Sequence, residues 1–125
     1  MARLFLTLAS FSGFIAVALG AFGAHGLRGR LDEALLSTYQ TGVEYQFIHT
    51  LALLAVALLL YRTPDSSSLK VSGWAFVIGI GLFSGSLYAL AFGAPSWVGP
   101  ITPVGGLSFM VGWLSLCWSA RQIQS

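Results

Sequence analysis

Residues 20–30, GAFGAHGLRGR, place four glycines and a histidine at the end of an apolar run, directly before and between two arginines. Such a segment suits a phosphate-binding loop, a metal site or the mouth of a membrane helix. A Walker loop requires a Gly-Lys-Ser/Thr ending, and a dinucleotide-binding loop requires a strand before it and a helix after it. Because the segment has neither context, the sequence favours the membrane helix.

The composition of the chain also indicates a membrane protein. Of its 125 residues, 56% are hydrophobic and only 8% are charged, whereas soluble domains are about 25% charged. One span requires about 20 apolar residues, so the chain has room for four. The net charge of +2 comes from six scattered basic residues and four acidic ones, without the basic patch typical of nucleic-acid-binding proteins. We therefore expect the lipid bilayer, and no nucleic acid, as a partner.

Four apolar runs predict an all-α fold, an integral membrane four-helix bundle in a single domain covering 1–125. The first run has Arg3 before it and small residues at 16–18, as in a secretory signal peptide. However, the apolar stretch continues past that candidate cleavage site, and the rest of the chain is equally apolar, so we expect a membrane span instead. The predicted spans are about 4–24, 39–61, 73–93 and 103–120.

The most polar segment lies between the first two predicted spans, at 28–37. Its acidic residues Asp32 and Glu33 suit the positive first turn of a helix. The segment is therefore predicted to form a short interfacial helix, or the start of a long second helix. The second span is expected to end at Arg62 and Pro64.

A rigid, uncharged turn is predicted between the third and fourth spans, in the segment APSWVGPITP at 94–103. Pro95 and Pro100 stiffen it, Thr102 is expected to cap the fourth helix, and Pro103 is expected to occupy the first helical position. We expect this turn to act as a stiff plug or a re-entrant segment that shapes the mouth of a cavity.

The basic residues predict the orientation in the membrane. Four of them fall on one side of the predicted bundle, against Arg28 and Arg30 on the other. Because cytoplasmic loops carry the excess of Lys and Arg, both termini are predicted to be cytoplasmic. The four are Arg3, Arg62, Lys70 and Arg121. Three tryptophans near predicted span ends suit aromatic anchors: Trp74, Trp97 and Trp118.

Small residues recur at helical spacing in the predicted spans. In lipid no hydrophobic force drives helices together, so small side chains that let backbones approach are typical of helix contacts. The third span carries a ridge of small residues at intervals of four, at Gly81, Gly85, Ala89 and Gly93, with Gly73 two such steps before Gly81. We expect the glycines to pack the four helices, or to form a homodimer contact. The predicted packing glycines are Gly13, Gly20, Gly23, Gly81, Gly85, Gly93 and Gly112.

Polar residues in the second span are the feature that packing explains least. An ionisable side chain inside a membrane is costly, and therefore is a candidate functional group. At about 100° per residue, Gln46 and His49 share one helix face and Tyr45 lies one turn from His49, whereas Glu44 lies well away from His49. Two interpretations stay open: hydrogen bonds between helices, or a proton or substrate site.

The sequence offers little support for catalysis or metal binding. It contains no Gly-x-Ser-x-Gly or His-Glu-x-x-His motif, and the lone Cys117 permits neither an intrachain disulfide nor a multi-cysteine site. His25 is expected to bond the last carbonyls of the first helix rather than a metal. We predict no cofactor and no metal, and an enzyme is the least favoured class.

Four segments in register resemble the YgdD-like family of small bacterial inner-membrane proteins, a domain of unknown function with distant transmembrane relatives in mitochondria. The segments are GAFGAHGL (20–27), YQTGVEYQFIHTLALL (39–54), GSLYAL (85–90) and GPITPVGGLSFMVGW (99–113). The resemblance implies a four-helix protein of the cytoplasmic membrane and no particular reaction. The positions that it nominates are Gly20, Gly23, His25, Gly26, Tyr45, Gln46, His49, Gly85, Tyr88, Thr102, Pro103, Gly105, Gly106 and Trp113.

Two functional hypotheses follow. In the first, a membrane-embedded site binds or translocates a small or lipid-like molecule through an outward-facing cluster of His25, Glu44, Gln46 and His49, with Tyr45 beside it. In the second, the protein is a structural or assembly protein whose glycine ridges bind partner helices, and the polar residues only determine the register of the helices.

Overall fold

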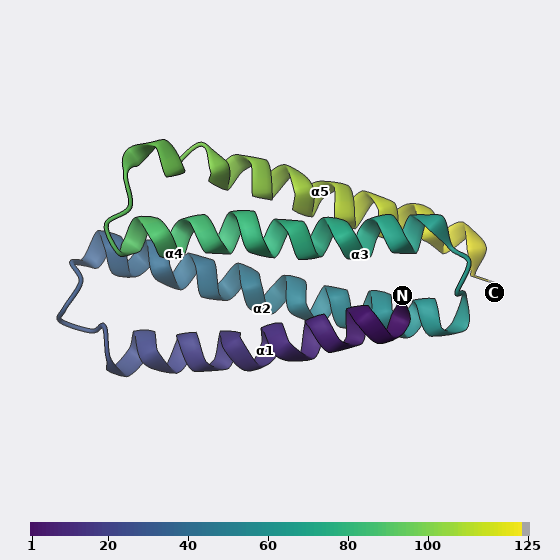
Figure 1. Ribbon diagram of the computed structural model, residues 1–125, viewed down its shortest axis with the longest axis horizontal. Helices are drawn as coiled ribbons and strands as arrows, with labels where there is room; N and C mark the ends of the chain where they lie inside the picture. Colours follow the sequence, from purple (N-terminus) through teal and green to yellow (C-terminus); the bar gives the residue numbers. More distant parts are fainter. Residues whose placement is uncertain (124–125) are drawn as a thin grey trace.

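The computed structural model describes residues 1–123, and its four long helices lie side by side (Figure 1). Each is long and apolar enough to cross a membrane, which confirms the predicted all-α membrane four-helix bundle. The third is one rod in three parts, α3, the π-helical turn η1 and α4, and the fourth is α5, with the 3-10 turns η2 before it and η3 after it. In order, the elements are α1 (Ala2–His25), α2 (Glu33–Arg62), α3 (Ser67–Gly79), η1 (Ile80–Ser84), α4 (Gly85–Ala91), η2 (Ser96–Val98), α5 (Ile101–Ser119) and η3 (Ala120–Gln122).

The predicted interfacial helix between the first two spans does not form. Residues 26–32 make a turn, and α2 begins at Glu33 and continues for 30 residues. Asp32 caps it, since its carboxylate accepts a hydrogen bond from the Leu35 amide at 2.8 Å. With a cap at Asp32 and no glycine or proline before Gly42, nothing separates a short helix from the span. The alternative of a long second helix is the correct one.

The fourth helix begins two residues earlier than predicted, at Ile101. Thr102 is not its cap, because the Thr102 amide already donates to the Gly99 carbonyl at 3.1 Å, as in a first turn. The Thr102 hydroxyl instead lies 2.5 Å from the Ser86 hydroxyl on α4. Pro103 therefore lies inside the first turn, where its missing amide removes no helical hydrogen bond. Pro95 and Pro100 flank η2, and this turn connects α4 to α5 at one end of the bundle (Figure 1).

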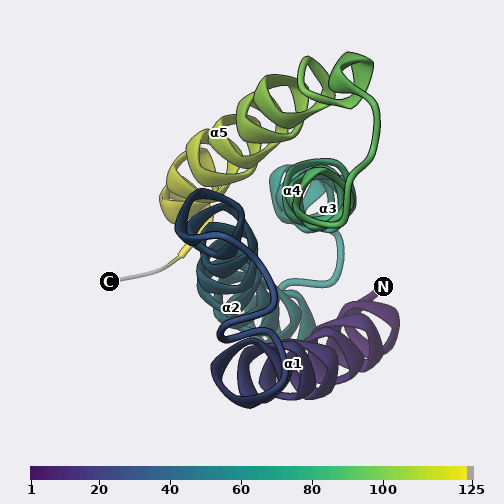
Figure 2. The same ribbon diagram turned by 90° about the vertical axis from the view of Figure 1, so that its left-hand side faces the viewer.

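The order of the helices in space follows their order in the chain. Viewed along the helices, α1 packs on α2, α2 packs on the rod of α3, η1 and α4, and α5 packs on that rod (Figure 2). Among the described residues α2 contributes the most buried side chains. Because α2 touches both α1 and the rod, it is the helix on which the arrangement depends.

The helices approach closely where a glycine faces an aromatic ring of a neighbouring helix. At each such glycine an added Cβ would lie closer than 3.0 Å to the ring, so no other residue fits without rearrangement. The pairs are Gly23 with Tyr39, Gly42 with Tyr88, Gly73 with Phe5, Gly79 with Phe109 and Gly112 with Phe76. At Gly105 the obstacle is the backbone of Phe83 itself, which marks the closest approach of α5 to η1.

The predicted packing glycines fall into three groups. Gly23 and Gly112 hold aromatic rings, and a Cβ added at Gly13 or Gly20 would lie at ordinary contact distance, 3.5 Å from Thr50 or Val43. The other three do not pack closely within the described chain: a Cβ added at Gly81 or Gly85 would have no neighbour within 4 Å, and Gly93 follows the end of α4 with a φ of 94°. An interval of four residues advances about 40° beyond a full turn. The ridge therefore winds from the inside of the rod at Gly73 to its outside at Gly81 and Gly85.

The close approach at Gly105 is testable with a single methyl group. Gly105→Ala is expected to destabilise the protein by about 1–3 kcal/mol, because the backbone of Phe83 cannot move aside. Gly81→Ala is the matched control, and should be neutral or stabilising by up to about 1 kcal/mol, since nothing lies near it and alanine favours helix. Unfolding in detergent micelles measures both. Equal stability of the two variants would contradict the packing at Gly105.

Candidate functional site

The five polar residues predicted to form one cluster lie in separate surroundings. Gln46 and His49 are buried against neighbouring helices, with 5% and 4% of their surface exposed. Glu44 is exposed on the outer face of α2, and His25 is exposed at the last residue of α1. Tyr45 is partly exposed and lies beside His49. The outward-facing cluster is therefore not formed, because the helical twist turns Glu44 away from the interior and His25 lies at the helix end.

Gln46 connects three helices. Its side-chain amide donates to the Ser12 carbonyl on α1 at 3.0 Å, and its carbonyl accepts from the Tyr88 hydroxyl on α4 at 2.6 Å. The Ser12 hydroxyl in turn lies 2.7 Å from the Thr50 hydroxyl. Since Gln46 is paired on both sides, it serves the packing of the bundle.

His49 makes one bond within its own helix and one to α5. Its Nδ1 lies 2.8 Å from the Tyr45 carbonyl oxygen, and its Nε2 lies 3.0 Å from the indole nitrogen of Trp113. A carbonyl only accepts and an indole N–H only donates, so the hydrogen is on Nδ1 and Nε2 is the acceptor. The imidazole is neutral, because a second proton on Nε2 would face the indole N–H directly.

Aromatic rings surround the imidazole of His49. Phe109 stacks on it with ring centres 3.5 Å apart and planes 8° apart. Phe76, Trp113 and Tyr45 lie with ring centres between 5.7 and 5.9 Å away. The histidine therefore lies in an apolar, aromatic setting in which its two hydrogen bonds are its polar contacts among the described residues.

A groove between α2 and α5 leads from the outer face of the bundle to His49. It has a volume of about 410 Å³ and is lined mostly by apolar and aromatic side chains. Its rim is open, with Met110 61% and Trp113 44% exposed. In a bilayer this rim faces the lipid. The lining residues are Tyr45, Ile48, His49, Phe83, Gly106, Phe109, Met110 and Trp113.

Glu44 and His25 lie apart from this groove. Glu44 lines a smaller hollow of about 210 Å³ between α1 and α2, beside Gly20, Ala24 and Gln40. The side chain of His25 makes no hydrogen bond within residues 1–123, and the end of α1 is instead closed by the Gly26 amide bonding the Phe22 carbonyl at 2.6 Å. In the described part of the chain, no three His, Cys, Asp or Glu side chains gather as metal ligands would.

Trp113 is the main contributor to the site that analysis of residue types missed. Of the other three tryptophans, Trp97 lies in η2 and Trp118 at the end of α5, where a ring can be anchored in the membrane surface, whereas Trp74 lies about two turns inside the rod. Trp113 likewise lies inside its helix, six residues before the end of α5. An indole N–H in lipid requires an acceptor, so a tryptophan at that depth is a signal for a polar partner on another helix. The resemblance nominated Trp113 without assigning that partner.

The hydrogen bonds of Gln46 are testable by removing its amide. Gln46→Ala leaves the Tyr88 hydroxyl and the Ser12 carbonyl without their partner, and is expected to lower the free energy of unfolding by about 1–2 kcal/mol. Gln40→Ala, on the exposed face of the same helix, is the control and should change it little. Unfolding in micelles compares the two variants, and equal stabilities would contradict a stabilising role for the hydrogen bonds of Gln46.

Comparison with known proteins gives a family and no activity. A family model described as a protein of unknown function, DUF423, matches residues 19–106. A UPF0382 membrane protein of Haemophilus influenzae is 50% identical over 125 residues, covering 100% of this chain and 99% of that protein. YwdK of Bacillus subtilis, also a UPF0382 membrane protein, is 41% identical over 118 residues, covering 94% and 96%. No solved structure matches.

The Escherichia coli relative is named the UPF0382 inner membrane protein YgdD. It is 43% identical over 128 residues, covering 98% of this chain and 92% of that protein. The expected resemblance is thereby confirmed. With four helices able to span a membrane and matches along almost the whole sequence, the chain belongs to the DUF423 family of membrane proteins.

Proposed function

We propose that this protein binds a lipid-like molecule with a hydroxyl group in the groove between α2 and α5. The observation that carries the proposal is the contact between His49 and Trp113 at 3.0 Å. It joins a buried acceptor to a donor at the open rim of an apolar groove. The proposed entry is lateral, from the lipid.

A hydroxyl is the group that this contact suits best. When it is inserted between the two side chains, its O–H donates to Nε2 of His49 and its oxygen accepts the indole N–H of Trp113. A carbonyl group only accepts and would leave Nε2 unpaired, whereas a hydroxyl satisfies both partners. The apolar remainder of the ligand would lie against Phe83, Phe109 and Met110.

Binding is a better proposal than catalysis for this groove. A hydroxyl bound to Nε2 of His49 would meet no carboxylate, amine or thiol among the described side chains that line the groove, so His49 has no second group beside it to complete a reaction. Acid–base catalysis requires a group that exchanges a proton with the substrate. Transport of the ligand would need a path across the bundle, and the residues that line this groove come from α2, η1 and α5.

A second candidate function is the binding of a partner helix or of a second copy of the chain. The observation that favours it is the outward-facing ridge of the rod, where a Cβ added at Gly81 or Gly85 would have no neighbour within 4 Å among the described residues. Such small residues allow close helix approach in lipid. The ridge lies on a different helix from His49, so the two functions can be tested with separate variants.

Native mass spectrometry of the purified protein tests the first function. Dioleoylglycerol, which has a free hydroxyl, should bind roughly tenfold more tightly than its acetylated form, and His49→Phe should abolish that preference. His25→Phe, at the exposed end of α1, is the control and should keep it. If wild type binds the two lipids equally, the hydroxyl site is wrong.

The same spectra test the second function. If the ridge binds a partner, Gly85→Leu is expected to remove a dimer or a co-purifying protein while the lipid preference remains. The His49→Phe variant serves as its control, because it should keep the partner. If Gly85→Leu leaves the assembly state unchanged, the ridge is not the surface that binds a partner.

We further propose that the protein resides in a bacterial inner membrane with both termini in the cytoplasm. The relative in Escherichia coli is named an inner membrane protein, and α1 begins at the same end of the bundle at which α5 ends (Figure 1). The side with four of the six basic residues is expected to be cytoplasmic.

Reporter fusions test this orientation. A fluorescent protein at the C-terminus should fold and emit, whereas alkaline phosphatase at the same position should be inactive, since it requires the oxidising periplasm. The same reporters inserted at Gly29, in the turn between α1 and α2, should give the reverse result. An active phosphatase at the C-terminus would overturn the orientation.

A further inference from the structure

A second cleft lies between α1 and α2, toward the end at which the chain begins. It consists of two adjoining hollows of about 360 and 230 Å³, which share Ala2, Arg3 and Tyr61 in their walls. The larger hollow continues along Leu6, Ala57 and Leu58, and the smaller one reaches Pro64 beyond the end of α2. The cleft therefore runs from an apolar part beside the span to a more polar part at the end of the bundle.

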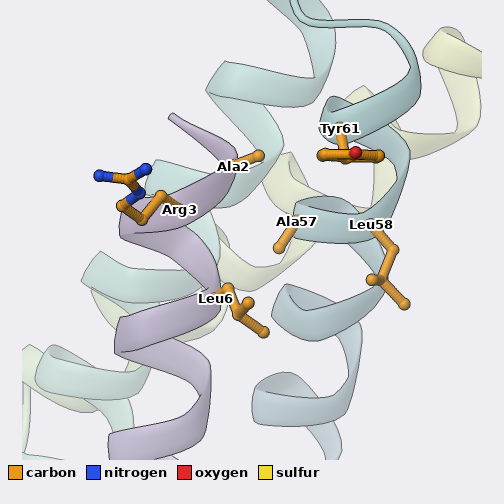
Figure 3. Close-up of a pocket in the computed structure, with 6 residues that line it drawn as sticks. All are labelled: Ala2, Arg3, Leu6, Ala57, Leu58 and Tyr61. Carbon is orange, nitrogen blue, oxygen red and sulfur yellow. The ribbon is translucent and has the colours of Figure 1, made fainter.

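The cleft exists because small side chains face each other at this level of the two helices. Ala2 and Ala57 stand where larger residues would close the gap, and Figure 3 shows both directed into it, with Leu6 below them. Arg3 contributes its stem to the wall, while its guanidinium points away from the gap (Figure 3). Tyr61 is 80% exposed at the upper edge.

Charge at this end of the bundle favours an anion. This end carries four basic residues and one acidic residue, Asp65; the basic ones are Arg3, Arg62, Lys70 and Arg121. At the other end, two basic residues, Arg28 and Arg30, are balanced by two acidic ones, Asp32 and Glu33. In residues 1–123 the backbone carbonyl of Arg3 accepts a hydrogen bond from the Thr7 hydroxyl at 2.9 Å, while its guanidinium points away from α2 (Figure 3). Its planar N–H groups therefore remain available for a phosphate, which arginine binds with two parallel hydrogen bonds.

We propose that this cleft binds an anionic glycerophospholipid. One acyl chain lies along Leu6, Ala57 and Leu58, and Arg3 turns toward the rim to hold the phosphate. The phenol of Tyr61 then lies in the headgroup layer, as tyrosines near span ends do. The site is separate from the groove at His49, since its α2 residues begin two turns further along that helix.

Native mass spectrometry with two lipids of identical acyl chains tests the charge part of the proposal. Palmitoyl-oleoyl-phosphatidylglycerol should bind more tightly than palmitoyl-oleoyl-phosphatidylcholine. Arg3→Gln should lower the affinity for phosphatidylglycerol roughly fivefold. Arg30→Gln, at the other end of the bundle, is the matched control and should leave its affinity unchanged. Equal losses in the two variants would show general attraction by net charge and overturn the site.

A second pair of variants tests the apolar part. Leu58→Trp places a large ring over the cleft from a position that is 60% exposed, and should reduce the binding of phosphatidylglycerol. Leu51→Trp, on the same face two turns away and 63% exposed, should not. Glycerol 3-phosphate, the headgroup chemistry without chains, should fail to displace the lipid. Displacement by it, or wild-type binding in Leu58→Trp, would contradict an acyl chain in the cleft.

Discussion

Lipid supplies no hydrophobic force that would hold these helices together, so every close contact depends on shape or on a hydrogen bond. Glycine notches filled by aromatic rings provide the shape, as where Gly42 of α2 receives Tyr88 of α4. The hydrogen bonds come mainly from polar side chains of α2, which reach α1 through Gln46 and α5 through His49. A chain with 8% charged residues is thus held together by a few polar groups, each paired across a helix boundary.

The same constraint explains why one of these groups is also the best candidate for function. Gln46 is enclosed by α1 and α4, and its partners are buried with it. His49 differs, because its partner Trp113 stands at an open rim. Opening the hydrogen bond between His49 and Trp113 would expose the acceptor Nε2 and the indole N–H donor side by side in an apolar groove. A ligand group that bonds to both of them offsets the free energy needed to separate them. The contact between His49 and Trp113 therefore holds two helices together and is also the proposed binding contact.

The fold was predictable, and the site only in part. Four apolar runs, the acidic first turn of the second helix and the proline-rich turn follow from local rules, and helical geometry places Gln46 and His49 together on one face and Glu44 away from His49. That this face is buried, and that Asp32 caps its helix whereas Thr102 does not, are seen only in the structure. The sequence leaves the ridge of Gly81 and Gly85 open between internal packing and a homodimer contact, because spacing alone does not say which face of a helix is covered. The partner of His49 lies 64 residues away on a helix of different register, and no local pattern connects the two.

In this structure His49 is a neutral imidazole, bonded through Nδ1–H to its own helix and through Nε2 to Trp113. Nitrogen NMR of protein with labelled histidine and tryptophan, in lipid bilayers at neutral pH, would report both hydrogen bonds. The buried imidazole should be protonated at Nδ1 alone, and the Trp113 indole N–H signal should shift in His49→Phe. A doubly protonated ring, or a proton on Nε2 with an indole signal indifferent to the substitution, would contradict this arrangement.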